Sequence, residues 1–118
     1  MPTKDEITQF LKELKNCQSI VVIDERQDGK NDETLTILGI TPKQRLEEIK
    51  ALNCENYYRG PTPDHDKPSD SFWEFGKRVK GKEIYIKVKI CRTSIGGKYA
   101  KCLSFHFAEK PIVYKFKK

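Results

Sequence analysis

Near the N-terminus, apolar residues recur with the period of an α-helix. Between residues 7 and 14 they are spaced three and four positions apart, as Ile7, Phe10, Leu11 and Leu14. This spacing gathers them on one helical face. Thr3 and Glu6 precede them with the spacing of a capping box. The pattern predicts an amphipathic helix over Thr3–Asn16.

The next segment is β-branched and short. Ile20–Ile23 is bounded by the polar residues Asp24–Gly29, which is typical of a strand closed by a turn. Asn31–Leu38 then predicts a brief helix, because Gly39 suits the position just after a helix C-terminus.

The residues Thr41-Pro42-Lys43-Gln44 predict the N-terminus of a further helix. Thr41 fits the N-cap, Pro42 the first helical position, and Gln44 the reciprocal position of a capping box. The apolar side of the helix carries Leu46, Ile49 and Leu52. We expect this helix to end near Asn53.

Residues 60–71 form a polar stretch that contains prolines. After it, apolar residues recur at every second position, as in a strand. We interpret 60–71 as a mobile loop. The strands predicted after it are Phe72–Val79, Glu83–Cys91 and Tyr99–Phe107, with a short edge segment at Ile112–Phe116. The order favours a single α+β domain over residues 1–118, in which N-terminal helices pack on a three- to four-stranded antiparallel sheet.

Alternate residues of a strand point to opposite faces of a sheet. Strict alternation assigns one face to the core: Trp73, Phe75, Ile84, Ile86, Val88, Ile90, Leu103, Phe105 and Phe107. The opposite face then carries Glu74, Tyr85, Lys87, Lys89, Cys102, Ser104 and His106. Because neighbouring strands lie about 4.8 Å apart, such groups can bracket a phosphate. An ordinary solvated face would show the same pattern.

Composition narrows the choice of partner. Lys and Arg exceed Asp and Glu by 6, and the surplus favours a polyanion such as nucleic acid. No apolar run approaches the ~20 residues of a transmembrane helix, and no signal peptide is apparent. Four cysteines without paired metal-ligand spacing indicate reduced thiols in the cytoplasm. Nucleotide-loop, Rossmann, nucleophile-elbow and zinc-protease motifs are absent from the sequence, so we expect neither cofactor nor metal.

RNA cleavage suits these side chains because RNA contains its own nucleophile, the 2′-hydroxyl. The reaction needs a base, an acid and cations around the phosphorane. Histidine titrates near neutral pH, so His106 is the natural proton carrier, with Glu74 or Tyr85 as its counterpart. The candidates for charge stabilisation and RNA contact are Arg59, Lys87, Lys89, Tyr58 and Arg78.

Other residues are weaker candidates for a functional role. His65, between Asp64 and Asp66, sits in a Pro-flanked loop where a solvated role is favoured over a metal site. Trp73 could stack a base, but its place beside Phe75 favours burial. The basic tail, residues 111–118 with Lys110 before it, could follow an RNA backbone or serve only solubility.

A series of short motifs follows in a distinctive order. It runs Leu38-Gly39-Ile40, a helix, Asn56-Tyr57-Tyr58-Arg59, a loop, Trp73-Glu74, Gly81–Val88, and finally Leu103-Ser104-Phe105-His106. This order resembles the MqsR (motility quorum-sensing regulator) toxins, which are mRNA interferases of type II toxin–antitoxin systems. The resemblance implies a RelE-like α+β fold, mRNA as substrate, on or off the ribosome, and a cognate antitoxin as partner.

The resemblance also implies catalytic positions. They fall on Arg59, Glu74, Tyr85 and His106, where the family has Lys, Gln, Tyr and Lys respectively. A glutamate near a phosphate helps only as a base or by orienting His106. We therefore expect a metal-independent endoribonuclease toxin; the alternative is a non-catalytic basic module that binds RNA or protein.

Overall fold

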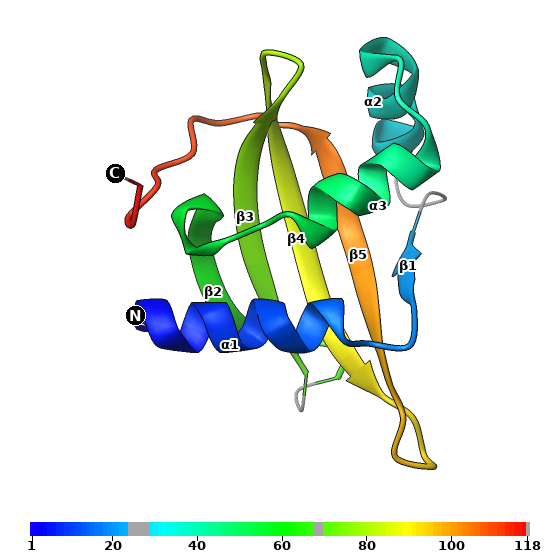
Figure 1. The fold of residues 1–118 in the computed structure, drawn as a ribbon, viewed down its shortest axis with the longest axis vertical. Coiled ribbons are helices and arrows are strands. Elements are labelled where there is room, and N and C mark those ends of the chain that lie inside the picture. The colour runs from blue at the N-terminus through cyan, green and yellow to red at the C-terminus, as the bar shows by residue number, and fades with distance from the viewer. Residues whose placement is uncertain (24–28, 68–69, 118) are drawn as a thin grey trace.

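The computed structural model describes residues 1–23, 29–67 and 70–117. The helices are α1 (Lys4–Lys15), α2 (Lys30–Leu38), α3 (Pro42–Lys50) and a short 3-10 helix, η2 (Cys54–Asn56). The strands are β1 (Ile20–Val22), β2 (Tyr57–Pro63), β3 (Ser71–Val79), β4 (Lys82–Arg92) and β5 (Lys98–Phe107). Among the described residues, one sheet runs in the order β1-β5-β4-β3-β2, and α1 and α3 lie across one of its faces (Figure 1). The predicted α+β class is confirmed.

Both predicted capping boxes form. The Glu6 N–H donates to Thr3 Oγ1 at 3.2 Å, and the Thr3 N–H donates back to Glu6 Oε1 at 3.0 Å. Thr41 and Gln44 make the same pair of bonds at the start of α3. Each box satisfies backbone donors that a helix N-terminus would otherwise leave unpaired.

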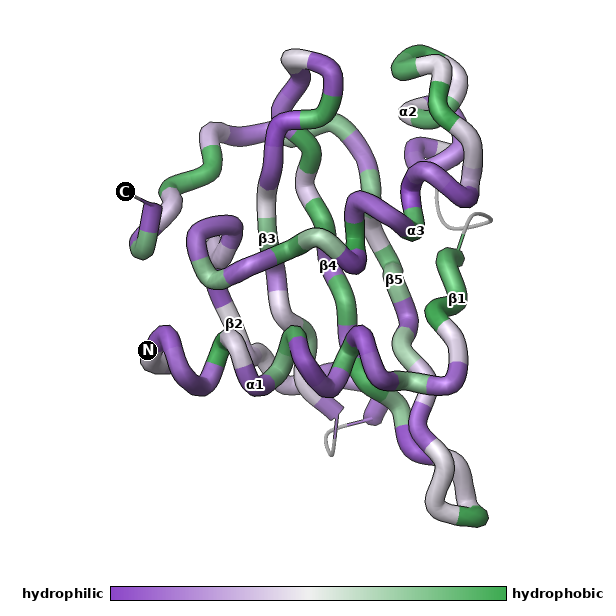
Figure 2. Tube along the Cα trace, in the orientation of Figure 1, coloured by the Kyte–Doolittle hydropathy of each residue, from purple (hydrophilic) through white to green (hydrophobic). Residues whose placement is uncertain are grey.

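The core lies between α1, α3 and one face of the sheet. Figure 2 shows apolar and polar positions alternating along β4, as a strand with one buried face requires. The side chains that meet there include Ile7, Leu14, Ile49, Phe75, Ile84, Ile86, Val88 and Phe105, all fully buried. No helix of the described residues is long and apolar enough to cross a membrane.

The sheet differs from the prediction at both edges. β1 pairs with β5 in parallel, so the sheet is mixed rather than wholly antiparallel and has five strands in the described part of the chain. On the other side, Gly60–Pro63 belongs to β2, not to a loop, because it pairs with the start of β3. The predicted turn at Asp24–Gly29 lies largely outside the described residues.

A register shift in β5 corrects the predicted faces. Lys87 pairs with Ser104 but Val88 pairs with Cys102, so Leu103 is an extra residue, as in a β-bulge. Cys102 is therefore fully buried in the core, whereas Leu103, predicted to point inward, is partly exposed. After the bulge, the side chains lie on the faces that the sequence predicted: Phe105 is buried in the core and His106 is on the opposite face.

Asn31 of α2 supports this bulge. Its side-chain amide donates to the main-chain oxygens of Ile23 and Leu103 at 2.8 and 3.2 Å. Its Oδ1 accepts the Phe105 N–H at 2.9 Å. Buried main-chain groups that the shift would leave unpaired are thereby satisfied.

We call the sheet face opposite α1, which carries Glu74, Tyr85, Lys87, Ser104 and His106, the polar face. The C-terminal segment, residues 108–117, crosses it as irregular chain rather than as the predicted edge strand. A Cβ on Gly76 would lie 2.5 Å from Ile112 Cδ1 and 2.7 Å from the Tyr114 hydroxyl, so the segment rests directly on β3. Tyr114 also donates to Glu83 at 3.0 Å, and the Phe116 ring lies 5.9 Å from that of Tyr57.

Gly76→Ala should loosen this segment. The new methyl group overlaps Ile112 and Tyr114, whose side chains must move off the sheet. We expect a stability loss of about 1 kcal/mol from overpacking and faster proteolysis of residues 108–117. Limited proteolysis followed by mass spectrometry measures this; unchanged protection of the segment would contradict the packing.

Candidate functional site

The four residues predicted as catalytic come together on the polar face, one from each of β2 to β5. Arg59 pairs with Glu74, and Tyr85 pairs with His106. Arg59 Nε lies 2.8 Å from Glu74 Oε2, and the Tyr85 hydroxyl donates to Glu74 Oε1. The rings of Tyr85 and His106 lie 5.4 Å apart between centroids. Four residues spread over 48 positions of sequence thus form one continuous row.

Glu74 is the anchor of this row. It is only 5% exposed, and each carboxylate oxygen accepts a hydrogen bond. A buried carboxylate needs such partners, because desolvation without them is costly. Glu74 thereby fixes Arg59 and Tyr85, and with 5% exposure it is not among the side chains that line the hollow described below.

Arg59 is held at one edge but open at the other. Its side chain is 59% exposed, and its hydrogen bond to Glu74 raises the pKa of the guanidinium further. The guanidinium also lies 4.9 Å above the ring of Tyr58. A guanidinium fixed through Nε can present its terminal N–H groups to an anion.

Tyr85 keeps its proton. Burial is the largest cause that raises the pKa of this phenol well above its ordinary value, and the hydrogen bond to Glu74 adds to it. Tyr85 therefore acts as a neutral donor that orients Glu74.

This raised pKa predicts a stability change at alkaline pH. Above about pH 10, an unfolded tyrosine releases a proton that native Tyr85 retains, so the free energy of unfolding falls as pH rises. Tyr114 contributes in the same direction, because burial and its bond to Glu83 raise its pKa to about 12. Urea unfolding should show that the free energy of unfolding falls less between about pH 8 and about pH 11 in Tyr85→Phe than in the wild type. Equal falls would contradict the assignment.

His106 has a defined ring orientation. Its Nδ1 lies 3.0 Å from the main-chain oxygen of Phe107. A carbonyl oxygen only accepts, so Nδ1 carries the hydrogen and the neutral ring leaves Nε2 as the acceptor. The side chain is partly exposed, which leaves Nε2 reachable.

A hollow of about 220 Å³ joins these groups. It is lined by Tyr58, Arg59, Tyr85, His106, Glu109 and Lys110. The last two come from the C-terminal segment, which forms one wall. The sequence analysis gave Glu109 no role and included Lys110 only with the basic tail that could follow an RNA backbone, and no motif marks either residue.

The predicted RNA-binding lysines differ sharply. Lys87 lies 4.3 Å above the Phe72 ring and forms no ion pair within the described residues. Lys89 is only 6% exposed and is paired with Asp64 at 2.6 Å and with Asp70 at 3.3 Å. Two carboxylates therefore already neutralise Lys89, and its burial keeps its ammonium away from a backbone phosphate, unlike that of Lys87.

Arg78, the remaining RNA-binding candidate, lies away from the hollow. It is exposed near the end of β3, where its Nη1 donates to the Gly81 oxygen at 3.0 Å. It does not line the hollow, so the structure does not bring it together with the catalytic candidates.

The loop histidine is separate as well. His65 is exposed, and its neighbour Asp64 faces Lys89, whose hydrogen bond lowers the pKa of that carboxyl. Within the described residues, no three His, Cys, Asp or Glu side chains gather as metal ligands would.

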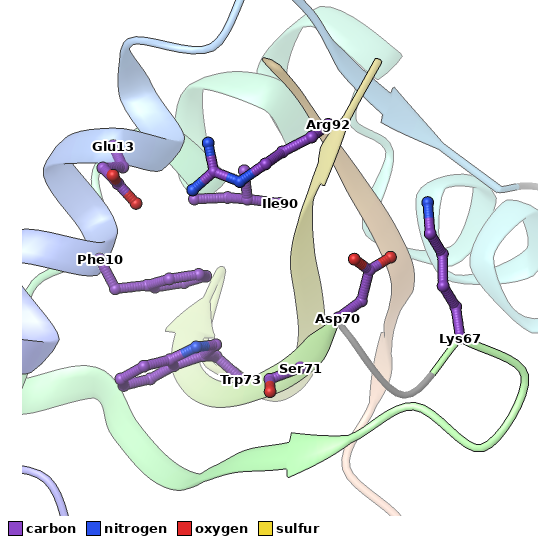
Figure 3. A pocket seen from close by; sticks show the side chains of 8 residues that line it. All are labelled: Phe10, Glu13, Lys67, Asp70, Ser71, Trp73, Ile90 and Arg92. Carbon is purple, nitrogen blue, oxygen red and sulfur yellow. The ribbon is translucent and has the colours of Figure 1, made fainter. Parts of the chain in front are cut away.

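A larger hollow, of about 360 Å³, lies beside α1 on the helix-covered side of the sheet. Figure 3 shows the stacked rings of Phe10 and Trp73 on one side of it and Asp70 and Lys67 on the other. The ring centroids of Phe10 and Trp73 are 4.4 Å apart. Trp73 therefore packs toward the core, as predicted, and the catalytic candidates do not line this hollow.

Comparison with protein-family models, with curated proteins and with solved structures found no match to this chain.

Proposed function

We propose that the protein is a metal-independent endoribonuclease that cleaves RNA by transesterification at the 2′-hydroxyl. One observation carries the proposal: His106, with Nε2 as its free acceptor, shares a hollow with Arg59 and Tyr85. A base beside a fixed cation is what attack by a 2′-oxygen on its own phosphate needs.

The reaction proceeds by one bond exchange at phosphorus. His106 Nε2 takes the proton of the 2′-hydroxyl as the O2′–P bond forms. The outward N–H groups of Arg59 bind the non-bridging oxygens and stabilise the charge of the phosphorane. The P–O5′ bond then breaks, and the products are a 2′,3′-cyclic phosphate and a 5′-hydroxyl once the leaving oxygen gains a proton.

The surrounding charge suits an RNA backbone. The chain carries a net charge of +6. Lys87 pairs in register with Glu74 and Ser104, about two residues along β4 from Tyr85. An ammonium there can bind the phosphate next to the one being cleaved. Phe72, which supports Lys87, gives the same position an aromatic surface.

In its biological role, the protein would be an mRNA interferase toxin of the cytoplasm, similar to the MqsR toxins. Its substrate would be mRNA, free or on the ribosome. A cognate antitoxin would bind the toxin and cover its basic surface. This role extends the sequence resemblance at Arg59, Glu74, Tyr85 and His106 and depends on the cleavage activity.

One observation favours a second candidate function. Glu74 neutralises Arg59, which reduces the charge that the row offers to a phosphate. A non-catalytic module with the same polar face would bind RNA in a strongly salt-dependent manner without cutting it.

One assay separates the two. Purified protein is incubated with a short RNA in EDTA, and the termini of the products are identified by mass spectrometry. The endoribonuclease yields 2′,3′-cyclic phosphate and 5′-hydroxyl ends. A requirement for added divalent metal, or salt-dependent binding without products, would overturn it.

A further inference from the structure

The leaving 5′-oxygen needs a proton, and the residues that line the hollow can be compared as its source. This inference rests on the proposed function, and the proton must come from a lining side chain that does not already use it in a hydrogen bond. Arg59 holds its protons tightly and uses Nε on Glu74. Tyr85 directs its one hydroxyl proton to Glu74, and His106 directs its Nδ1 hydrogen to the Phe107 oxygen.

Glu109 is excluded as the proton donor for a different reason. Its carboxylate lies 3.0 Å from Lys30 Nζ, and the hydrogen bond to Lys30 lowers its pKa. It is therefore ionised and has no proton to give. Tyr58 and Lys110 remain.

Lys110 meets a second requirement that Tyr58 does not. Because Glu74 already balances Arg59, the hollow needs a further positive charge as the phosphorane forms. An ammonium supplies both a proton and that charge. Within the described residues, Lys110 is exposed and forms no hydrogen bond or ion pair, so its ammonium is available to a substrate.

The chain also holds Lys110 in place from both sides. On one side, the Ala108 N–H donates to the Glu83 oxygen at 3.0 Å and Glu109 binds Lys30. On the other side, Ile112 and Tyr114 rest on Gly76. Lys110 lies between these two anchors and lines the hollow that contains His106.

We propose that Lys110 is the general acid of the reaction. As the P–O5′ bond breaks, a proton passes from Lys110 Nζ to the 5′-oxygen, which leaves as a hydroxyl. The neutral amine regains a proton from water, while His106 returns to water the proton it took from the 2′-hydroxyl. A general acid of this kind contributes about 10²–10⁴-fold to a rate.

The test uses a leaving group that needs no acid. Two RNA substrates are compared in EDTA, one with the natural 5′-oxygen and one with a bridging 5′-sulfur at the cleaved linkage. Lys110→Gln should slow cleavage of the oxygen substrate by about 10²-fold or more, yet cleave the sulfur substrate within a few-fold of the wild-type rate. His106→Ala should slow both.

Matched variants complete the design. Lys43→Gln removes one exposed charge from α3, on the other side of the sheet, and should behave like the wild type with both substrates. Circular dichroism checks that each variant is folded. If Lys110→Gln matched Lys43→Gln, or lost equal activity on both substrates, Lys110 would not be the acid.

Two further outcomes are decisive. A loss confined to the oxygen substrate in Tyr58→Phe, but not in Lys110→Gln, would transfer the role to Tyr58. If the wild type cleaved neither substrate, the proposed function itself would be overturned and this inference with it.

Discussion

Replacing His106 by alanine is expected to slow RNA cleavage in EDTA by about 10²–10⁴-fold, the usual contribution of a general base. Among the side chains that line the hollow, the imidazole offers an acceptor nitrogen, Nε2, because Nδ1 faces the Phe107 oxygen. Glu74 is buried and does not line the hollow. Rates measured under single-turnover conditions on a short RNA report the chemical step. The fold should survive, since the side chain is partly exposed.

The other histidine provides the control. His65 is exposed in the loop after β2 and does not line the hollow, so His65→Ala should cleave at the wild-type rate. Free imidazole added to His106→Ala should restore part of the activity, because it can enter the space that the side chain leaves. An activity of His106→Ala within a few-fold of the wild type would refute the base role.

The four-residue row also explains how a glutamate can lie beside the proposed phosphate site. Glu74 is only 5% exposed, and its two oxygens bind Arg59 and Tyr85. The cost is that Arg59 no longer contributes an unbalanced charge. In the proposed reaction, His106 and Lys110 carry the two proton transfers, and Lys110 adds the positive charge that Glu74 balances at Arg59.

Local signals in the sequence predicted much of this arrangement. Thr3 with Glu6 and Thr41 with Gln44 identify helix starts because the bonds of a capping box span only three residues. The face of Tyr85 follows from the alternation of β4, because a one-residue error would bury its lysines and expose its isoleucines. Such rules need no knowledge of distant partners.

The features that the sequence did not predict depend on distant partners. Lys89 lies on the predicted face, but its burial depends on Asp64 and Asp70, which are 25 and 19 residues away. The wall formed by Glu109 and Lys110 depends on the contact between the C-terminal segment and Gly76. Neither contact leaves a periodic pattern in the chain.

The bulge at Leu103 is the clearest case. Strict alternation gave the correct face for His106 but the wrong faces for Cys102 and Leu103. Ala100 and Cys102 both face the core. If the alternation continued from them without a bulge, His106 would face the core as well. One extra residue brings it beside Tyr85 instead, and Asn31, from a helix more than 70 residues earlier, pairs the main chain there.

Asn31→Ala should therefore destabilise the protein by about 2–4 kcal/mol, because it leaves the buried Phe105 N–H and two part-buried carbonyl oxygens without this partner. Helix propensity acts in the opposite direction, since alanine is the better helix former, so the loss does not come from weakening the helix itself. Urea unfolding at neutral pH measures it. Asn16→Ala, at the exposed end of α1, should change stability by no more than about 0.5 kcal/mol.

Asn31→Asp separates hydrogen bonding from side-chain volume. It retains an oxygen for the Phe105 N–H but turns a second oxygen toward the carbonyls of Ile23 and Leu103, where the amide donated. Two acceptors facing each other in a buried place repel, so we expect a loss at least as large as that of Asn31→Ala. Near-wild-type stability of Asn31→Asp would mean that side-chain volume, not donated hydrogen bonds, holds the bulge and the phase of His106.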